Sequence, residues 1–299
     1  MNNYAKILRR PSNDEPIAKL SSALSRGKSI SWGAILGLAL SSLTVWGAPA
    51  DSIVATESVP DLSSGVKAQA QLLEKSRLAN DDLYASLKSF VCQEEIQRFE
   101  GNLRGSKTHP IDRVSANLSF ENGVERYSDI RQNTRSLASI SALDGAWSEG
   151  EFGTLLQQTA QLLETQSASF IASTTLAGKA AAIYRFSVAE QESPWDLEVD
   201  LRHYRIPFTT DVWISASSGE ILKITRKSSA MPEQTRISEI DWDVTLDAVD
   251  LNGKTWRLPT AAAYSVSYAD FKRREWNQMS FSGYRRYSSE SSLRFDGFK

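Results

Sequence analysis

Apolar and polar residues alternate along much of the chain, which predicts a protein built mainly from β-strands. Alternation places successive side chains on opposite faces of a strand, so that one face packs and the other meets water. Short turns join the runs, and no regular exchange of strand and helix supports a parallel sheet. We expect strands at 90–99, 114–120, 125–130, 180–188, 195–201, 210–215, 220–226, 240–244, 258–268, 276–287 and 292–295. The pattern indicates about ten to twelve antiparallel strands.

An Asn-Gly pair between two alternating runs is the strongest local signal. Asn122 and Gly123 lie in the segment 121–124, which separates the runs 114–120 and 125–130. A type I′ turn needs positive φ at both central residues, which Asn and Gly adopt readily, so these runs are predicted to form a hairpin. The loop 216–219 predicts a second hairpin, and the pair 252–253 predicts another tight turn.

Two segments have helical spacing instead. Between residues 63 and 87 apolar side chains recur at three- and four-residue steps, and Asn80 with Asp81 leaves open a division into two helices. The second helix is expected over 149–165. Ser148 and Glu151 fit a capping box at its start, in which the serine accepts an amide and the glutamate reaches back.

The predicted fold class is α+β and mainly β: a large curved antiparallel sheet or half-barrel covered by two or three helices. An apolar sheet face has to be covered, and the stripes of the helices at 63–87 and 149–165 suit that task. Two interiors remain possible, a filled core or a cavity that holds a ligand.

The first fifty residues indicate export. A basic lead is followed by the uncharged stretch 29–50, which ends in Ala48-Pro-Ala50 before Asp51, and this order is typical of a Sec-type secretory signal peptide. An uncleaved anchor is the alternative, since the uncharged stretch is long enough to span a bilayer. We expect a signal peptide at 1–50, a flexible lead at 51–62 and a single β-rich domain at 63–299. The expected location is periplasmic or secreted, with no transmembrane span after signal cleavage.

Composition and charge narrow the function classes. Cys92 is the only cysteine, so the exported domain has no internal disulfide and must be stabilised by its core. The chain holds 34 basic and 36 acidic side chains, and six of the basic ones lie in the first fifty residues. The remainder is therefore mildly acidic, whereas nucleic-acid-binding domains normally carry a basic footprint.

No catalytic or metal-binding motif rises above background. His109 and His203 are the only histidines, and neither has a second ligand at metal spacing. Serine-hydrolase, P-loop and dinucleotide motifs are missing from the sequence. A Cys92–histidine pair and a glycosidase-like carboxylate pair, Glu94–Glu95 or Asp241 and Asp243, remain as catalytic alternatives. The water-facing side of strands is the expected place for these carboxylates, because Asp241 and Asp243 flank Trp242 in plain alternation. The sequence predicts no enzyme, no metal and no cofactor.

A stretch from Tyr204 to Thr225 carries a family resemblance. Its strand Asp211-Val-Trp-Ile-Ser, a short glycine turn and the strand Glu220-Ile-Leu-Lys-Ile are similar to a strand pair of the lipoprotein-carrier superfamily (LolA, LolB and RseB-like domains). The order of signal, long helix, hairpins, middle helix and hairpins also resembles that superfamily over most of 63–299. The segment 276–287 looks like the closing region of uncharacterised exported bacterial proteins. Ser215 departs from the aspartate often found at its place.

The resemblance implies a periplasmic protein that carries or senses a lipid-like ligand or a lipoprotein in a concave apolar cavity, without covalent chemistry. Because neighbours on a strand face opposite sides, Trp213 and Ile214 cannot both point into it. Ordinary core packing is the alternative role for the candidates. The alternative function is a structural or interaction protein of the cell envelope, with envelope proteins as partners and a filled core. The candidate ligand-binding residues are Trp195, Leu197, Trp213, Trp242, Leu118 and Phe120.

Overall fold

The computed structural model describes residues 65–103, 108–121, 123–269 and 272–286. The predicted signal peptide, the lead 51–62, the strand 292–295 and Asn122 lie outside these residues. Within them, the helices are α1 (Val66–Ser86) and α2 (Thr154–Thr165), with short 3-10 helices at Leu87–Ser89, Ile140–Ala142, Glu190–Glu192 and Glu233–Thr235. The strands are β1 (Phe90–Asn102), β2 (Thr108–Glu121), β3 (Val124–Gln132), β4 (Arg135–Ser136), β5 (Ser169–Leu176), β6 (Lys179–Val188), β7 (Asp196–Val199), β8 (Arg202–Arg205), β9 (Phe208–Ser215), β10 (Ile221–Ser228), β11 (Ile237–Leu251), β12 (Lys254–Tyr268) and β13 (Arg273–Arg286).

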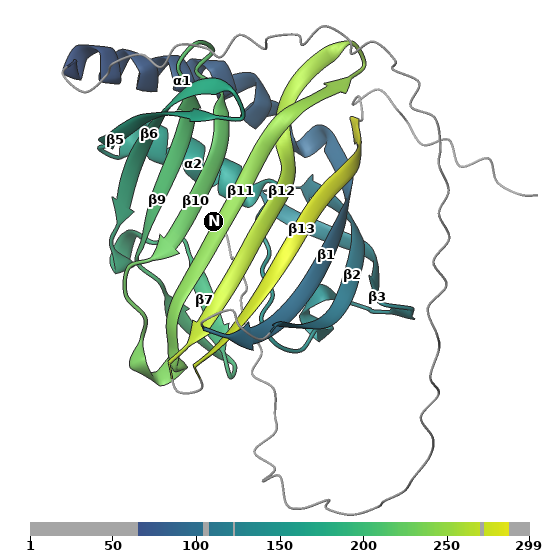
Figure 1. Cartoon of the computed structure of the whole chain (residues 1–299). Coiled ribbons are helices and arrows are strands. Elements are labelled where there is room, and N and C mark those ends of the chain that lie inside the picture. The colour runs from purple at the N-terminus through teal and green to yellow at the C-terminus, as the bar shows by residue number, and fades with distance from the viewer. Residues whose placement is uncertain (1–64, 104–107, 122, 270–271, 287–299) are drawn as a thin grey trace, which may run out of the picture. The chain divides into compact units, whose positions relative to one another are not determined.

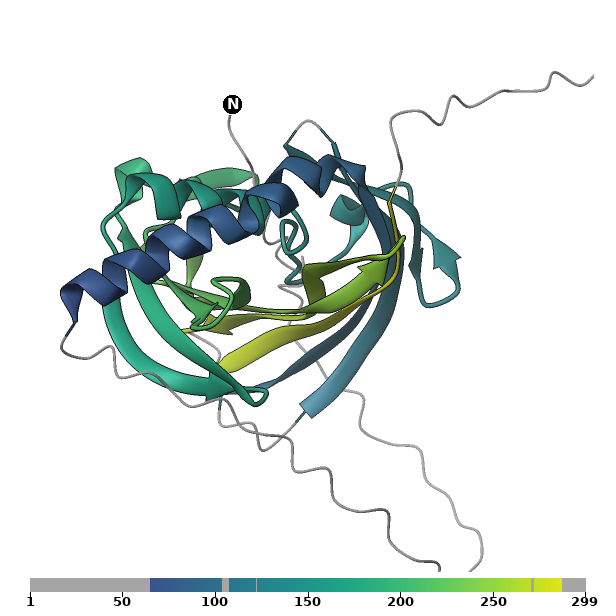
Figure 2. The same ribbon diagram turned by 90° about the horizontal axis from the view of Figure 1, so that it is seen from above.

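Eleven of these strands form one antiparallel sheet in the order β4-β3-β2-β1-β13-β12-β11-β10-β9-β6-β5, and β7 pairs with β8 separately (Figure 1). The sheet is curved, and α1 crosses it from the β5–β6 side to the β1–β2 side (Figure 2). It is not closed, because β4 and β5 are edge strands. The predicted fold class, a large curved antiparallel sheet with helices, is confirmed.

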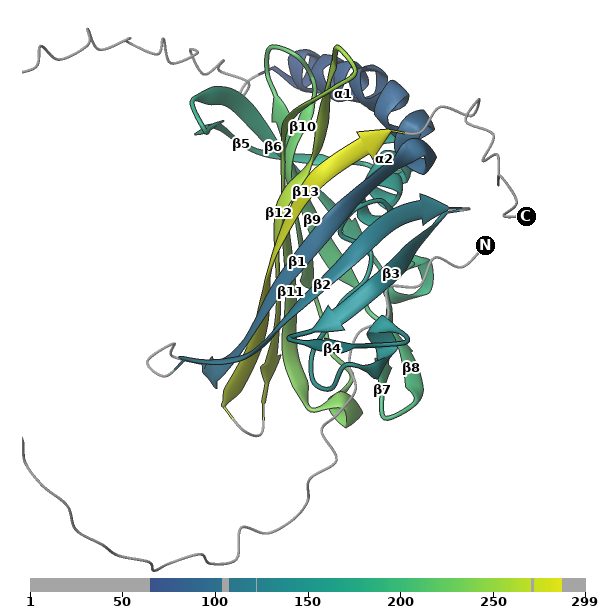
Figure 3. The same ribbon diagram turned by 90° about the vertical axis from the view of Figure 1, so that its right-hand side faces the viewer.

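Both helices cover the same face of the sheet (Figure 3). We call this the inner face and the opposite one the outer face. Strand β11 illustrates the division: Ile240, Trp242 and Val244 are buried on the inner face, and Asp241 and Asp243 alternate with them on the outer face. The alternation in the sequence therefore predicted correctly which side chains pack.

Helix α1 is one continuous helix, so the alternative of two helices is wrong. Asn80 is buried, and its side-chain amide donates to the carbonyl oxygens of Ser76 at 2.6 Å and Gly219 at 3.3 Å. The amide of Ile221 donates to its side-chain oxygen at 3.4 Å. Asn80 thus joins α1 to the β9–β10 connection, and these bonds satisfy an amide that would otherwise favour a break.

Helix α2 starts at Thr154 and not at residue 149, so the predicted capping box does not cap it. Ser148 donates to the Glu151 carboxylate, but both precede the helix. The backbone N–H groups of Gly150, Phe152, Gly153 and Thr154 donate instead to the carboxylate of Glu125 on β3. A long-range carboxylate replaces the local cap.

The turn predictions hold where the structure describes them. Gly123 has φ 80° in the β2–β3 hairpin, and Asn252 and Gly253 have φ 53° and 77° between β11 and β12. The strand predicted over 195–201 is shorter, because Asp200 and Leu201 adopt positive φ and turn the chain into β8.

Strand lengths differ from the prediction at other places too. Strand β12 begins at Lys254, ahead of the predicted 258, and passes through Pro259 at an irregularity in its pairing with β11. Such a bulge accommodates a proline, which has no N–H for the ladder. Strand β5 was not predicted from the alternation at all.

Candidate functional site

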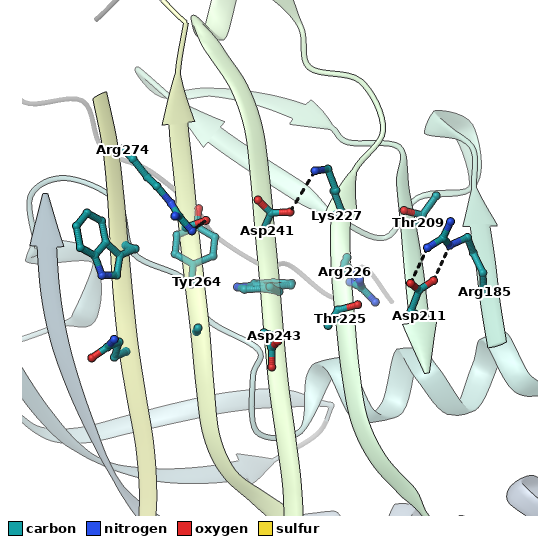
Figure 4. A pocket seen from close by; sticks show the side chains of 15 residues that line it. Arg185, Thr209, Asp211, Thr225, Arg226, Lys227, Asp241, Asp243, Tyr264 and Arg274 are labelled. Carbon is teal, nitrogen blue, oxygen red and sulfur yellow. Dashed lines mark hydrogen bonds and ion pairs between the residues drawn. The ribbon is translucent and has the colours of Figure 1, made fainter. Parts of the chain in front are cut away.

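A groove of about 580 Å³ lies on the outer face across β6 and β9 to β13 (Figure 4). Arg185 on β6 binds Asp211 on β9 through two nitrogens, at 2.6 and 2.7 Å. Lys227 on β10 lies 3.9 Å from Asp241 on β11. Strand alternation brings these charges to one face, and they neutralise one another in pairs.

Asp241 is a carboxylate of this groove with a raised pKa. Partial burial raises its pKa to about 6, and the hydrogen bond and charge of neighbouring Glu239 add to the effect, whereas Lys227 opposes it. Lys227 also pairs with Glu239, and Lys223 lies 2.5 Å from Asp243. Asp241 and Asp243 thus each lie near a lysine on the outer face, as alternation predicted. The expectation that Glu94 faces water is wrong, because its side chain is buried on β1.

The remaining catalytic alternative needs a reactive cysteine beside a histidine. Cys92 is buried on β1, and burial raises the pKa of its thiol, so the thiolate is disfavoured at neutral pH. It pairs across the ladder with Leu118, whereas His109 lies opposite Glu100 near the other end of β1. His203 lies on β8, outside the large sheet, and its Nδ1 is 2.7 Å from Asp196. The structure does not bring the thiol and these rings together.

On the inner face, behind the groove, Arg226 is buried among aromatic rings. Its side chain is on β10 with 1% of the residue exposed, and its guanidinium carbon lies 4.1 Å from the ring centroid of Phe208. Trp195 and Trp242 lie at 5.9 and 5.7 Å from the same carbon and stack on each other with centroids 5.2 Å apart. Tyr264 extends the cluster, 6.0 Å from Trp242.

The hydrogen-bond partners of this guanidinium are neutral. Nη1 donates to Oε1 of Gln158 on α2 at 2.7 Å, and Nε donates to the Thr210 hydroxyl at 3.3 Å. Burial lowers the pKa of Arg226 to about 9, so the group remains charged at neutral pH. A buried charge is usually compensated by an opposite one. Within the described residues no carboxylate pairs with Arg226.

A second polar cluster is acidic and lies at the start of α2. Glu94, Glu125 and Glu151 are buried, and desolvation raises the pKa of each, that of Glu151 to about 8. Glu125 also accepts the Tyr127 hydroxyl at 2.9 Å. One carboxyl oxygen each of Glu94 and Glu151 has no hydrogen-bond partner among the described residues. Within the described residues, no three or more His, Cys, Asp or Glu side chains are grouped so that they could hold a metal ion.

Five of the six predicted ligand-binding residues belong to one hydrophobic core, and Trp213 lies outside it. Leu118 and Phe120 are buried on β2, where the Phe120 ring packs against the backbone of Gly153. Trp213 is half-buried on the outer face, 5.5 Å below the Lys223 ammonium, while Ile214 faces inward. The structure brings together Trp195 and Trp242, with Leu197 buried on β7. Their role in ligand binding stays a prediction.

Arg226 and Gln158 were not identified from the sequence. A signal for Arg226 was present, because Leu222, Ile224 and Arg226 alternate on β10 and place a cation where an apolar side chain is expected. Gln158 gives a similar signal, because it is a polar residue on the buried side of the amphipathic helix α2. A charged or amide side chain at an inward position is therefore the pattern that finds this site.

No family model matches this sequence, and no curated protein matches it. Among solved structures, the chain is similar to a LolA superfamily protein from Nitrosomonas europaea, with 9% identity, a TM-score of 0.35, and 74% of this chain and 94% of that chain covered. A DUF1329 family protein from Desulfovibrio piger has 10% identity, a TM-score of 0.38 and coverages of 76% and 95%. Lipoprotein LppX from Mycobacterium tuberculosis has 11% identity, a TM-score of 0.24 and coverages of 72% and 94%.

The first of these structures is named for the superfamily that the sequence resembles. Neither helix in the described part of the chain has the length and hydropathy of a membrane-spanning helix.

Proposed function

We propose that this protein is an exported binding protein that carries or senses a lipid-like ligand or a lipoprotein between the inner face of its sheet and its helices. The supporting observation is the covered inner face, which is apolar and rich in aromatic rings. Trp195, Trp242, Phe208 and Tyr264 are buried there. Apolar chains bind to such surfaces because contact with water is lost on both sides.

Helix α1 is the part of this cover that is most easily moved. Only Leu72, Ser76, Asn80 and Leu83 are buried along it, and Leu78 remains 57% exposed. Because α1 has few buried apolar contacts, its local opening costs little free energy. We therefore assign α1 the role of a lid over the interior.

Hydrogen bonds hold this lid at several points along its length. The Tyr184 hydroxyl donates to the carbonyl of Gln69 at 3.0 Å, and Lys254 pairs with Asp82 at 3.0 Å. Lys75 donates to the carbonyl of Ser217. These polar contacts exchange with water more readily than packed apolar ones, which suits a helix that opens and closes.

Native mass spectrometry after gentle purification tests the binding function. We expect a mass above that of the polypeptide, released on denaturation as an acyl lipid, and a shift of the apo protein on adding lipid micelles or a lipoprotein. A polypeptide mass alone, unchanged by either addition, would refute the proposal.

The groove on the outer face favours a second candidate, an interaction protein of the cell envelope with a filled core. Its matched charge pairs, such as Arg185 with Asp211, suit a protein surface better than an apolar chain. Crosslinking in the envelope tests it: reversing Arg185 to glutamate should abolish a crosslinked partner, and exchanging both members of the pair should restore it. If the variant with glutamate at this position keeps every crosslink of the wild-type protein, this candidate is refuted.

A further inference from the structure

The cluster around Arg226 contains more hydrogen-bond donors than acceptors. Five buried groups in it have no hydrogen-bond partner among the described residues: Nη2 of Arg226, Nε2 of Gln158, Nε1 of Trp195, Nε1 of Trp242 and the hydroxyl of Tyr264. The nitrogens among them can only donate. Their side chains are contiguous through the Arg226–Gln158 hydrogen bond and the ring contacts of the two tryptophans and the tyrosine.

The two acceptors that contact the guanidinium are already used. Gln158 Oε1 accepts from Nη1 of Arg226, and the Thr210 hydroxyl oxygen accepts from Nε. Each buried polar group left without a partner costs about 1–3 kcal/mol, and a charged group costs more. Buried polar groups in folded proteins are nearly always satisfied, so five such donors together indicate an acceptor from outside the chain.

The missing acceptor should carry negative charge. The guanidinium is the only charged group of the cluster. Glu151 and Glu275 are near enough to Tyr264 for their charges to raise the pKa of its hydroxyl, but neither pairs with Arg226. Rings of Phe208, Trp195 and Trp242 surround the cation and exclude water, which strengthens any charge interaction made there. The fork of a guanidinium also matches the oxygen pairs of carboxylate and phosphate.

We propose that the donors around Arg226 bind an anionic oxygen group, a carboxylate or a phosphate, at the head of an apolar-chain ligand that lies against the inner face. This inference rests on the proposed function and names its ligand class: an anionic amphiphile. Gln158 belongs to α2 and Arg226 to β10, so the bound head group joins the helix to the sheet.

The test compares wild-type protein with Arg226→Met and Arg113→Met. Methionine keeps the volume of the buried side chain without the charge, and it should raise the melting temperature of the unliganded protein, because a buried charge without a counter-charge costs free energy. Arg113 is an exposed arginine on β2, 3.6 Å from Glu95, and serves as the matched control. Arg226→Gln provides a second variant if methionine impairs folding, which circular dichroism will show.

Binding is measured by tryptophan fluorescence with palmitate, hexadecyl phosphate, methyl palmitate and inorganic phosphate. Wild type and Arg113→Met should bind one of the two anionic amphiphiles at least about tenfold more tightly than methyl palmitate, a difference of about 1.4 kcal/mol. Arg226→Met and Arg226→Gln should bind the anionic and neutral chains alike.

The four ligands separate failure of this inference from failure of the proposed function. Equal binding of anionic and neutral chains by wild type would overturn the anion site and leave the lipid-binding function intact. Binding of inorganic phosphate alone, lost in Arg226→Met, would support the anion site and refute the lipid ligand. Binding of none of the four would overturn both.

Discussion

Glu151 is buried beside Glu125 just before α2, and its protonation should make stability depend on pH. Burial, with the charge of Glu125, raises its pKa from 4.5 to about 8 in the folded protein. The stabilisation that comes from keeping this carboxyl protonated is fully present below the pKa of Glu151 in the unfolded chain. Between the two values the unfolded chain loses a proton that the folded protein keeps, so the free energy of unfolding falls by about 1.4 kcal/mol per pH unit. Glu94, whose pKa is also raised, acts in the same direction.

We predict that Glu151→Gln flattens this dependence. Urea unfolding at about pH 5 and about pH 8.5 should show a smaller loss of stability in the variant than in wild type, because glutamine has no proton to lose. Glu164→Gln, at an exposed position on α2, is the control and should follow wild type. Identical slopes in all three proteins would show that Glu151 is ionised throughout.

Glu125 caps α2 from another strand, and its removal should be costly. Its carboxylate accepts four backbone N–H groups of residues 150–154 and the Tyr127 hydroxyl. We predict that Glu125→Ala lowers the free energy of unfolding by about 3 kcal/mol, since buried amides lose their acceptor. Glu125→Gln keeps one acceptor oxygen and should lose less. Alanine at exposed Glu121, measured by the same urea titration, should change little.

Side-chain direction was the most predictable property at this scale. Alternation put Trp242 inward and correctly made Trp213 and Ile214 alternatives, of which Ile214 faces the core. The partners of inward polar groups were not predictable. Arg226 donates a hydrogen bond to Gln158, which lies 68 residues away along the chain, and no local sequence pattern predicts a partner that distant.

At the scale of elements, Gly219 determines how closely α1 approaches the β9–β10 connection. It has φ +79°, and an added Cβ would lie 2.9 Å from the carbonyl oxygen of Lys75 on α1. We predict that Gly219→Ala destabilises the protein by about 1–3 kcal/mol from backbone strain and, in addition, loosens α1. Hydrogen exchange of residues 66–86 should become faster.

Gly178 offers a matched control for this change. It has φ +77°, but no atom lies within 4 Å of the position of an added Cβ. Gly178→Ala should therefore introduce the same backbone strain of a positive φ, but it should leave hydrogen exchange of α1 unchanged. Equal acceleration in both variants would mean that the exchange reports global stability and not the position of the lid.

The start of α2 shows why element boundaries were harder to predict than elements. Ser148 and Glu151 have capping-box spacing, yet the helix begins later because Glu125 occupies its first amides. The hairpins β2–β3, β9–β10 and β11–β12 were predicted because their turns are encoded locally by glycine or asparagine. Strand β5 has few buried side chains, so its alternation is weak.

At the scale of the whole molecule, the export proposal makes a direct prediction. The sequence places cleavage after Ala50, so N-terminal sequencing of the mature exported protein should begin at Asp51. Recovery of the intact N-terminus with the membrane fraction would instead support the uncleaved anchor. Fusion of residues 1–50 to a reporter enzyme measures export independently of the β-rich domain.

The order of strands in the sheet was beyond the sequence pattern. Alternation identifies hairpin neighbours, but β6–β9 and β1–β13 are pairings between strands that are not consecutive. Such long-range pairings depend on packing of the inner face as a whole and leave no local trace.

The β1–β13 pairing has a consequence for the timing of folding. Phe90 pairs with Arg286 and Phe99 with Trp276, so the first strand described lies beside the last one, in the interior of the sheet and not at its edge. In the export that we propose, the β1–β13 ladder would form only after β13 has crossed the membrane, because an exported chain emerges N-terminus first. Ladders between distant segments also form slowly, so we expect the sheet to be completed late in folding.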